Sequence, residues 1–323
     1  MSTSQVLDRT FYLYRNNFVL FAGIAIITPA LQLIALLVQL KIFGPVVIPQ
    51  QPDNVTPQFF GALIVRAIIG VLIGSIIYLI GTALASSATA YAVSMVHLGK
   101  TTTIVEAYSR VKPIFFRIVW LLLLIIIFTA GPLIFSYAFF LALALAIPIL
   151  AKSGGSSGVM LAAIGGGLIG FVAFLGGLVW MLYALCRYAL AVPACTLEGL
   201  PAGQSMVRSR FLTYKVKWGI LGIVLLTWLM SFILTYALQL PALLASHSAF
   251  MTAKSNLSMA ATAWIYFAQF LGGTLAGPVT TIALVLVYYD QRVRKEAFDL
   301  QLMMEAMGQQ ALAPPAAAAP IIG

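Results

Sequence analysis

The chain has 323 residues, of which 62% are apolar and only 8% carry a charge. A soluble domain carries roughly a quarter charged residues, so this composition excludes a water-soluble fold and makes hydrocarbon the expected solvent. The net charge of +10 does not indicate a nucleic-acid partner, because the basic residues lie between apolar segments, where membrane topology explains them better.

Six apolar segments are long enough to cross a bilayer, which takes about 20 residues in a helix. They cover residues 18–40, 61–96, 118–150, 159–185, 218–245 and 263–289. The first follows Arg9 and Arg15. We interpret it as a transmembrane helix and not a cleavable signal, because it is longer than a signal's apolar core and no Ala-x-Ala pattern follows it. The sequence therefore predicts an all-α polytopic membrane protein.

The second and third segments are long enough to contain two crossings each, and Gly131-Pro132 is a natural break in the third. The positions of the basic residues favour one crossing for each. With six crossings, 14 of the 18 basic residues fall on one side, together with both termini. Because loops rich in Lys and Arg stay in the cytosol, we expect a bacterial inner-membrane protein with both termini inside. Tilt, kinks or protrusion should take up the extra length.

One transmembrane helical domain is expected over residues 1–306, followed by a disordered Ala/Pro-rich cytosolic tail over 307–323. Three short external loops are expected between the paired spans. Residues 44–58 are rich in Pro and Gln, 152–158 form a Gly/Ser turn, and 246–258 are polar. None of them is expected to form a receptor domain.

Three short segments that lead into the odd-numbered spans are alike. Residues 7–15, 104–110 and 205–210 each contain arginine and each precede a span. Thr103 and Glu106 have the spacing of a capping box, which predicts a helix start. We therefore expect three helical hairpins, each entered by a short helix that lies in the membrane interface on the cytosolic side. Chance similarity between the segments is the alternative.

Glycines support the same repeat. Gly99 and Gly199 recur at a spacing of one hundred residues, each just before an entry segment. Each even-numbered span also contains two glycines four residues apart, which would give its helix a flat face for close packing. These pairs are Gly70 and Gly74, Gly166 and Gly170, and Gly273 and Gly277.

Two sets of charged residues are candidate sites. Arg187 and Asp290 close spans four and six, where an ion pair would neutralise both. A structural pair or two unrelated solvated residues would be the simpler interpretation.

The other set belongs to the entry helices and would form a rim that gathers anionic lipid headgroups or an acidic partner. It consists of Arg9, Arg15, Arg110, Lys112, Arg208 and Arg210. The alternative is that these charges only set the orientation in the membrane.

Residues typical of catalysis or of metal binding are not found together. None of the eight acidic residues falls in the middle of a predicted span, which disfavours ion-coupled transport. His97 and His247 are predicted at opposite ends of the bilayer. Cys186 and Cys195 have no histidine nearby and lie near the reducing cytosol, so we expect no metal site, disulfide or cofactor. No His-Glu-x-x-His, Gly-x-Ser-x-Gly or Walker pattern occurs, and an enzyme is not expected.

Two segments carry a family resemblance. Residues 7–18, LDRTFYLYRNNF, and residues 288–300, YYDQRVRKEAFDL, resemble the start and the last span exit of bacterial multi-span proteins named after the membrane domain of glycerophosphoryl diester phosphodiesterases. The order and number of spans also fit. Only 23 residues follow Leu300 in the sequence, too few for the catalytic barrel of the eponymous enzymes. The resemblance therefore implies a stand-alone membrane module, without the phosphodiesterase activity.

The leading hypothesis is a non-enzymatic inner-membrane protein that binds membrane lipids, anionic ones among them, or a membrane-protein partner, in a scaffold or accessory role. The alternative is a channel or facilitator for a lipid or an amphiphilic solute. It rests on polar residues within the spans, namely Thr28, Gln32, Gln39, Ser75, Thr82, Gln269 and Thr274. Their convergence on one continuous cavity would favour transport, and a dry, filled bundle would favour a scaffold.

Overall fold

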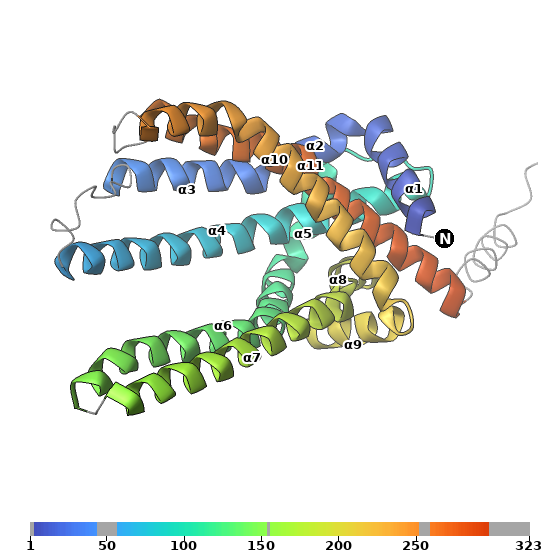
Figure 1. Ribbon diagram of the computed structural model, residues 1–323. Coiled ribbons are helices and arrows are strands. Elements are labelled where there is room, and N and C mark those ends of the chain that lie inside the picture. Colours follow the sequence, from blue (N-terminus) through green and yellow to red (C-terminus); the bar gives the residue numbers. More distant parts are fainter. Residues whose placement is uncertain (1–2, 44–56, 154–155, 252–258, 297–323) are drawn as a thin grey trace, which may run out of the picture.

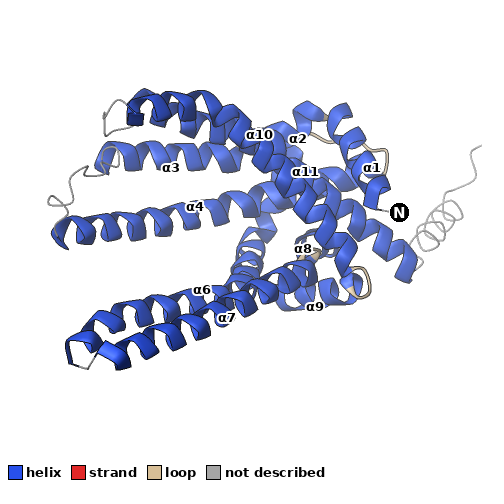
Figure 2. Cartoon of the chain, in the orientation of Figure 1, coloured by secondary structure: helices blue, strands red, loops and turns tan. Residues whose placement is uncertain are grey.

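The computed structural model describes residues 3–43, 57–153, 156–251 and 259–296, and helices account for nearly all of them (Figure 2). No strand occurs in these ranges. In chain order the α-helices are α1 (Thr3–Asn16), α2 (Phe18–Ala25), α3 (Ile27–Phe43), α4 (Pro57–His97), α5 (Ile104–Val111), α6 (Phe115–Ser153), α7 (Ser156–Tyr188), α8 (Ala191–Glu198), α9 (Ala202–Thr213), α10 (Lys217–Met251) and α11 (Met259–Glu296). The 3-10 helix η2 (Lys112–Ile114) joins α5 to α6.

Six helical stretches are long and apolar enough to cross a membrane. They are Phe18–Ile42, Val65–His97, Ile104–Phe139, Ile164–Glu198, Lys217–Leu244 and Ala260–Glu296. This confirms the prediction of an all-α polytopic membrane protein with six spans. The over-long second and third segments are each one continuous helix, α4 and α6, and not two crossings.

The helices extend into the segments that were predicted as external loops. Residues 57–58, 152–153, 156–158 and 246–251 are all helical, because the spans continue beyond their most apolar parts. The rest of these loops lies outside the described residues, as does the predicted tail over 307–323.

Three long hairpins, α3–α4, α6–α7 and α10–α11, run from one end of the molecule, and the short helices α1, α5, α8 and α9 gather at the other end (Figure 1). We call the latter the short-helix end. The α6–α7 hairpin diverges from the other two hairpins with distance from this end (Figure 1). Helix α11 is the central element, because it packs against α1, α2, α3, α4 and α10, and half of its most apolar stretch is buried.

The protein core lies at the short-helix end. Its fully buried large side chains come from separate helices and include Phe21 of α2, Ile118 of α6, Leu212 of α9 and Tyr288 of α11. Farther along the hairpins many apolar side chains are exposed, as expected for surfaces that face lipid. Packing at the short-helix end therefore holds the three hairpins together.

The three hairpins enter in the predicted way, each after a short helix. Helix α5 begins directly after Thr103, whose hydroxyl accepts the backbone N–H of Glu106 at 3.2 Å, as the capping-box spacing predicted. Gly99 and Gly199 occupy equivalent places before α5 and α9, and both have left-handed backbone angles, with φ of +73° and +67°. Glycine adopts this conformation without strain, so these two positions let each preceding helix end in a tight turn. Helix α8 was not predicted.

Prolines within the spans are accompanied by aromatic hydrogen-bond donors. Pro132 in α6 has no N–H for the carbonyl of Phe128, and Nε1 of Trp180 in α7 donates to that carbonyl at 2.9 Å. This bond explains how α6 continues through the Gly131-Pro132 break. Three other aromatic side chains donate to carbonyls near a proline, but not to the carbonyl four residues before it: Trp264 to Leu238 before Pro241 (3.0 Å), Tyr14 to Leu275 before Pro278 (2.7 Å), and Tyr108 to Ile24 before Pro29. Within hydrocarbon no water could replace the Trp180 donor at the Phe128 carbonyl.

The glycines predicted to pack helices together do not behave alike. A Cβ atom added at Gly74 or Gly277 would meet nothing within 4 Å, so the predicted packing role is wrong for both. At Gly70 and Gly273 the added atom would meet a side chain of α3 at 3.3 and 3.0 Å. Gly166 is half-buried and Gly170 is buried.

Two other glycines make backbone approaches as close as any of these. An added Cβ at Gly81 of α4 would lie 3.0 Å from Cα of Thr28 in α3, and one at Gly177 of α7 would lie 3.0 Å from Cα of Leu133 in α6. In these two hairpins, the point where the helices cross determines which glycine lies in close contact with the neighbouring backbone. The four-residue spacing within one helix does not determine it.

Candidate anionic-ligand site

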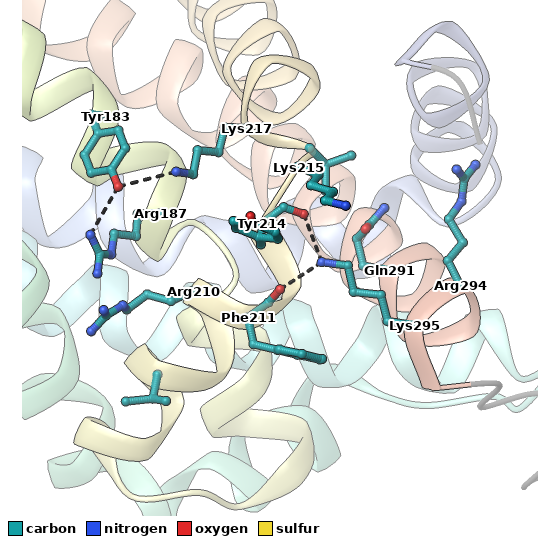
Figure 3. Close-up of a pocket in the computed structure, with 12 residues that line it drawn as sticks. Tyr183, Arg187, Arg210, Phe211, Tyr214, Lys215, Lys217, Gln291, Arg294 and Lys295 are labelled. Carbon is teal, nitrogen blue, oxygen red and sulfur yellow. Dashed lines mark hydrogen bonds between the residues drawn. The ribbon is translucent and has the colours of Figure 1, made fainter.

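A hollow of about 860 Å³ opens at the short-helix end between α7, α9, α10 and α11 (Figure 3). Six basic side chains line it: Arg187, Arg210, Lys215, Lys217, Arg294 and Lys295. We call this hollow the basic groove. Its other lining residues include Tyr183, Phe211 and Tyr214, so the charges are set among aromatic rings.

The turn between α9 and α10 forms one wall of the basic groove. Helix α9 ends at Thr213, and Lys215 in the following turn has a left-handed backbone with φ of 71°. Nζ of Lys295, on α11, donates to the carbonyls of Phe211, Leu212 and Tyr214 at 2.8 to 3.0 Å, and Figure 3 shows the bonds to Phe211 and Tyr214. A cation at a helix C-terminus satisfies carbonyls that have no intrahelical donor and complements the helix dipole. Lys295 therefore fixes this turn and with it the position of Lys215.

Tyr183 organises the opposite wall. Its hydroxyl accepts hydrogen bonds from Nη1 of Arg187 at 3.2 Å and from Nζ of Lys217 at 3.4 Å (Figure 3). The Lys217 ammonium also lies 4.5 Å from the centroid of the Tyr183 ring, a cation–π distance. One phenol thus holds two cations from different helices, α7 and α10, beside each other.

Carboxylates do not neutralise the basic groove. Among the described residues, Arg294 alone has an acidic partner, Asp290 on the same helix, at 3.1 Å. Within the described part of the chain, no carboxylate lies within salt-bridge distance of the other five basic side chains. A site with such an excess of positive charge attracts an anion, and phosphate oxygens suit both guanidinium and ammonium donors.

A second groove, apolar and about 540 Å³ in volume, adjoins the basic groove. It runs between α7 and α10 along Val179, Leu182 and Leu221, and it shares Tyr183 and Lys217 with the basic groove. We call it the apolar groove. Trp218, also in its lining, is 85% exposed at the start of the fifth span, which is typical of an aromatic side chain at a membrane interface. The two grooves together combine a charged head site with an apolar track that leads into the spans.

The predicted pair of Arg187 and Asp290 does not form. Asp290 instead binds Arg294, one helical turn farther along α11, and the Arg187 guanidinium binds the Tyr183 hydroxyl. A partner four residues away on the same helix is always within reach, whereas a partner on another helix requires the right rotation of both helices. Local pairing therefore takes precedence here.

The six residues of the predicted rim have separate surroundings. Arg210 lines the basic groove, whereas Arg9, Arg15, Arg110 and Lys112 are exposed elsewhere at the short-helix end. Arg208 is not a free rim charge, because it belongs to a partly buried ion cluster. Arg208 thus has carboxylate partners, and the gathering of anionic lipid or an acidic partner by this rim stays a prediction.

That ion cluster joins α8, α9 and α11. Arg208 of α9 binds Glu198 at 3.0 Å and also pairs with Glu296, and Arg292 lies 3.3 Å from Glu296. The Tyr288 hydroxyl donates to Glu198. Burial alone would lower the pKa of Arg208, but its hydrogen bonds and charge contacts with both glutamates raise it above its ordinary value. The cluster ties three helices together beside the basic groove.

The remaining sequence predictions concern metal ligands and cysteines. Cys186 and Cys195 are both buried with free thiols. Among the residues that the structure describes, no group of three or more His, Cys, Asp or Glu side chains is placed to hold a metal ion.

The residues that the sequence did not single out are Tyr183, Lys215, Lys217 and Lys295, which define the basic groove. The only local signal was the density of Lys and Arg around the start of the fifth span. No protein family model, no curated protein and no solved structure matches this chain. The resemblance to membrane domains of glycerophosphoryl diester phosphodiesterases therefore stays a prediction.

Proposed function

We propose that this integral membrane protein binds an anionic phospholipid, with the phosphate headgroup in the basic groove and an acyl chain along the apolar groove. One observation carries the proposal: four cations that have no carboxylate partner within the described part of the chain, Arg187, Arg210, Lys215 and Lys217, line a hollow that adjoins an apolar groove between two spans. Anionic phospholipid is the abundant membrane molecule with both features.

We further propose that the short-helix end faces the cytosol in a bacterial inner membrane. All four segments that hold the 14 basic residues counted from the sequence meet at this end. The positive-inside rule then places both termini and the basic groove at the anionic inner leaflet. The role is binding and not catalysis, in agreement with the lack of catalytic motifs in the sequence.

The test is the amount of anionic phospholipid that copurifies with the full chain in mild detergent, measured by native mass spectrometry. In the variant Arg187→Gln/Lys217→Gln both cations held by Tyr183 are removed. Each basic residue near an anionic surface contributes about 1 kcal/mol, so the two changes should weaken lipid binding roughly 30-fold.

The matched control is Arg110→Gln/Lys112→Gln, which removes the same charge from exposed positions at the same end but outside the groove. Its copurified lipid should stay near the wild-type level. Equal lipid in all three proteins would contradict lipid binding, and equal loss in both variants would mean that overall charge attracts lipid without a site.

A further inference from the structure

A second cavity lies within the spans, where α2 and α3, α4 and α11 meet. Its volume is about 200 Å³, and its lining is unusually polar for this depth, with Thr28, Gln32, Thr82, Ser86 and Thr281 among its residues. Thr82 falls near the middle of the span Val65–His97, so the cavity is far from both membrane surfaces. We call it the proline cavity.

Two prolines border it. Pro29 of α3 and Pro278 of α11 both line it. Proline has no N–H to donate, so the carbonyls four residues earlier, those of Ala25 and Thr274, lose their ordinary helical donors. Ala25 itself lines the cavity, at the point where α2 ends and α3 begins. Breaks of this kind at membrane depth are tolerated where the backbone lines a polar cavity.

A buried hydroxyl without a partner marks the same place. Within the described part of the chain, Oγ1 of Thr28 is inaccessible to solvent and makes no hydrogen bond. Ser86, by contrast, donates to the Thr82 carbonyl at 2.5 Å, the usual solution for a hydroxyl inside a helix. An unsatisfied hydroxyl surrounded by hydrocarbon is unfavourable, so the protein itself does not satisfy every polar group around this cavity.

The lining also limits the charge of the ligand. None of the residues that line the proline cavity has an ionisable acidic or basic side chain at neutral pH. An ion in the middle of the bilayer would have no opposite charge and would be strongly disfavoured. Hydroxyl and amide groups in this number favour a small uncharged molecule that both donates and accepts several hydrogen bonds.

The polar residues that the sequence singled out converge here only in part. Thr28, Gln32 and Thr82 line the cavity. Gln39 instead donates to the carbonyl of Gly70 at 3.2 Å. The others lie apart from it: Ser75 donates to the Leu72 carbonyl, Thr274 donates to the Phe270 carbonyl, and Gln269 is exposed. They do not share one cavity, so a binding site fits the arrangement better than a continuous pore.

We propose that the proline cavity binds a small uncharged polyol, a molecule of the size and hydroxyl content of glycerol. The volume exceeds that of a single water, whose share of the liquid is about 30 Å³. The site is independent of the basic groove, because the two share no residue.

The test uses the full chain in lipid nanodiscs with glycerol as the probe, and saturation-transfer NMR as the readout. Thr82→Val/Thr281→Val keeps the side-chain shape and removes two hydroxyls that line the cavity from α4 and α11, and should weaken glycerol binding about tenfold. The matched control is Thr129→Val, because Thr129 is also a buried threonine in a span but binds only carbonyls of its own helix.

A second variant guards against misfolding of the first. Gly277→Leu adds a side chain at the cavity wall, where an added Cβ meets nothing within 4 Å, and should abolish binding by filling the space. Unchanged glycerol signals in both variants would overturn the proposal. A wild-type protein with no glycerol signal would also overturn it, since the cavity would then hold only water.

Discussion

The bond between Trp180 and the Phe128 carbonyl gives the sharpest test of how the α6–α7 hairpin is held together. Trp180→Phe keeps an aromatic ring but removes the N–H that reaches this carbonyl at 2.9 Å. Pro132 cannot supply a backbone donor, and the site faces lipid, so the carbonyl is left without a partner. An unsatisfied polar group of this kind costs about 1–3 kcal/mol.

A double-mutant cycle isolates this effect from lost packing. Pro132→Ala restores the backbone N–H to the Phe128 carbonyl, so Trp180→Phe should cost about 1–2 kcal/mol less in that background than in the wild type. The free energy of unfolding is measured by SDS titration in mixed micelles, with Trp218→Phe as the control. Trp218 is 85% exposed and makes no hydrogen bond in the described residues. An equal cost of Trp180→Phe in both backgrounds would refute the reasoning.

Two further predictions concern packing and topology. Gly81→Leu should lower the melting temperature in detergent, because its Cβ would lie 3.0 Å from backbone of α3 and overpacking typically costs about 1–3 kcal/mol. Gly74→Leu is the control, because a Cβ at Gly74 would meet nothing within 4 Å, and it should leave the melting temperature unchanged or raise it, since glycine is a poor helix former. An equal fall in melting temperature in both variants would mean that the close approach at Gly81 does not cause the loss. Reporter fusions at Thr102 should give a cytosolic signal and fusions at Ser156 a periplasmic one, and a periplasmic signal at Thr102 would contradict the orientation.

Local and compositional features of the fold could be predicted from the sequence. The six spans follow from apolar length alone, and the start of α5 follows from the Thr103 and Glu106 spacing. Helix α8 was missed because its eight residues show neither an apolar period nor a capping residue with a side-chain hydrogen bond.

Relations between helices could not be predicted in this way. Lys217 and Lys295 lie far apart in sequence, and only the packing of α11 against α9 and α10 brings them to one groove. The glycine pattern failed at Gly74 and Gly277 for a similar reason: spacing within one helix defines a face, but not which helix lies against that face. The proline cavity likewise needs two prolines on different helices to meet, which a single sequence does not indicate.

The excess of positive charge in the basic groove follows from how the few carboxylates are used. The chain has eight acidic residues, and among those that the structure describes Glu198, Asp290 and Glu296 lie near this groove. Each of them is engaged by an arginine of α9 or α11. A buried or partly buried ion pair stabilises little in net terms but fixes geometry, since removing one partner leaves the other charge unsatisfied. The ion cluster therefore positions α9 and α11 and at the same time withdraws the nearby carboxylates from Arg187, Arg210, Lys215 and Lys217. Those cations are left to a ligand from outside the protein, and the apolar groove that adjoins them favours one with a hydrocarbon tail.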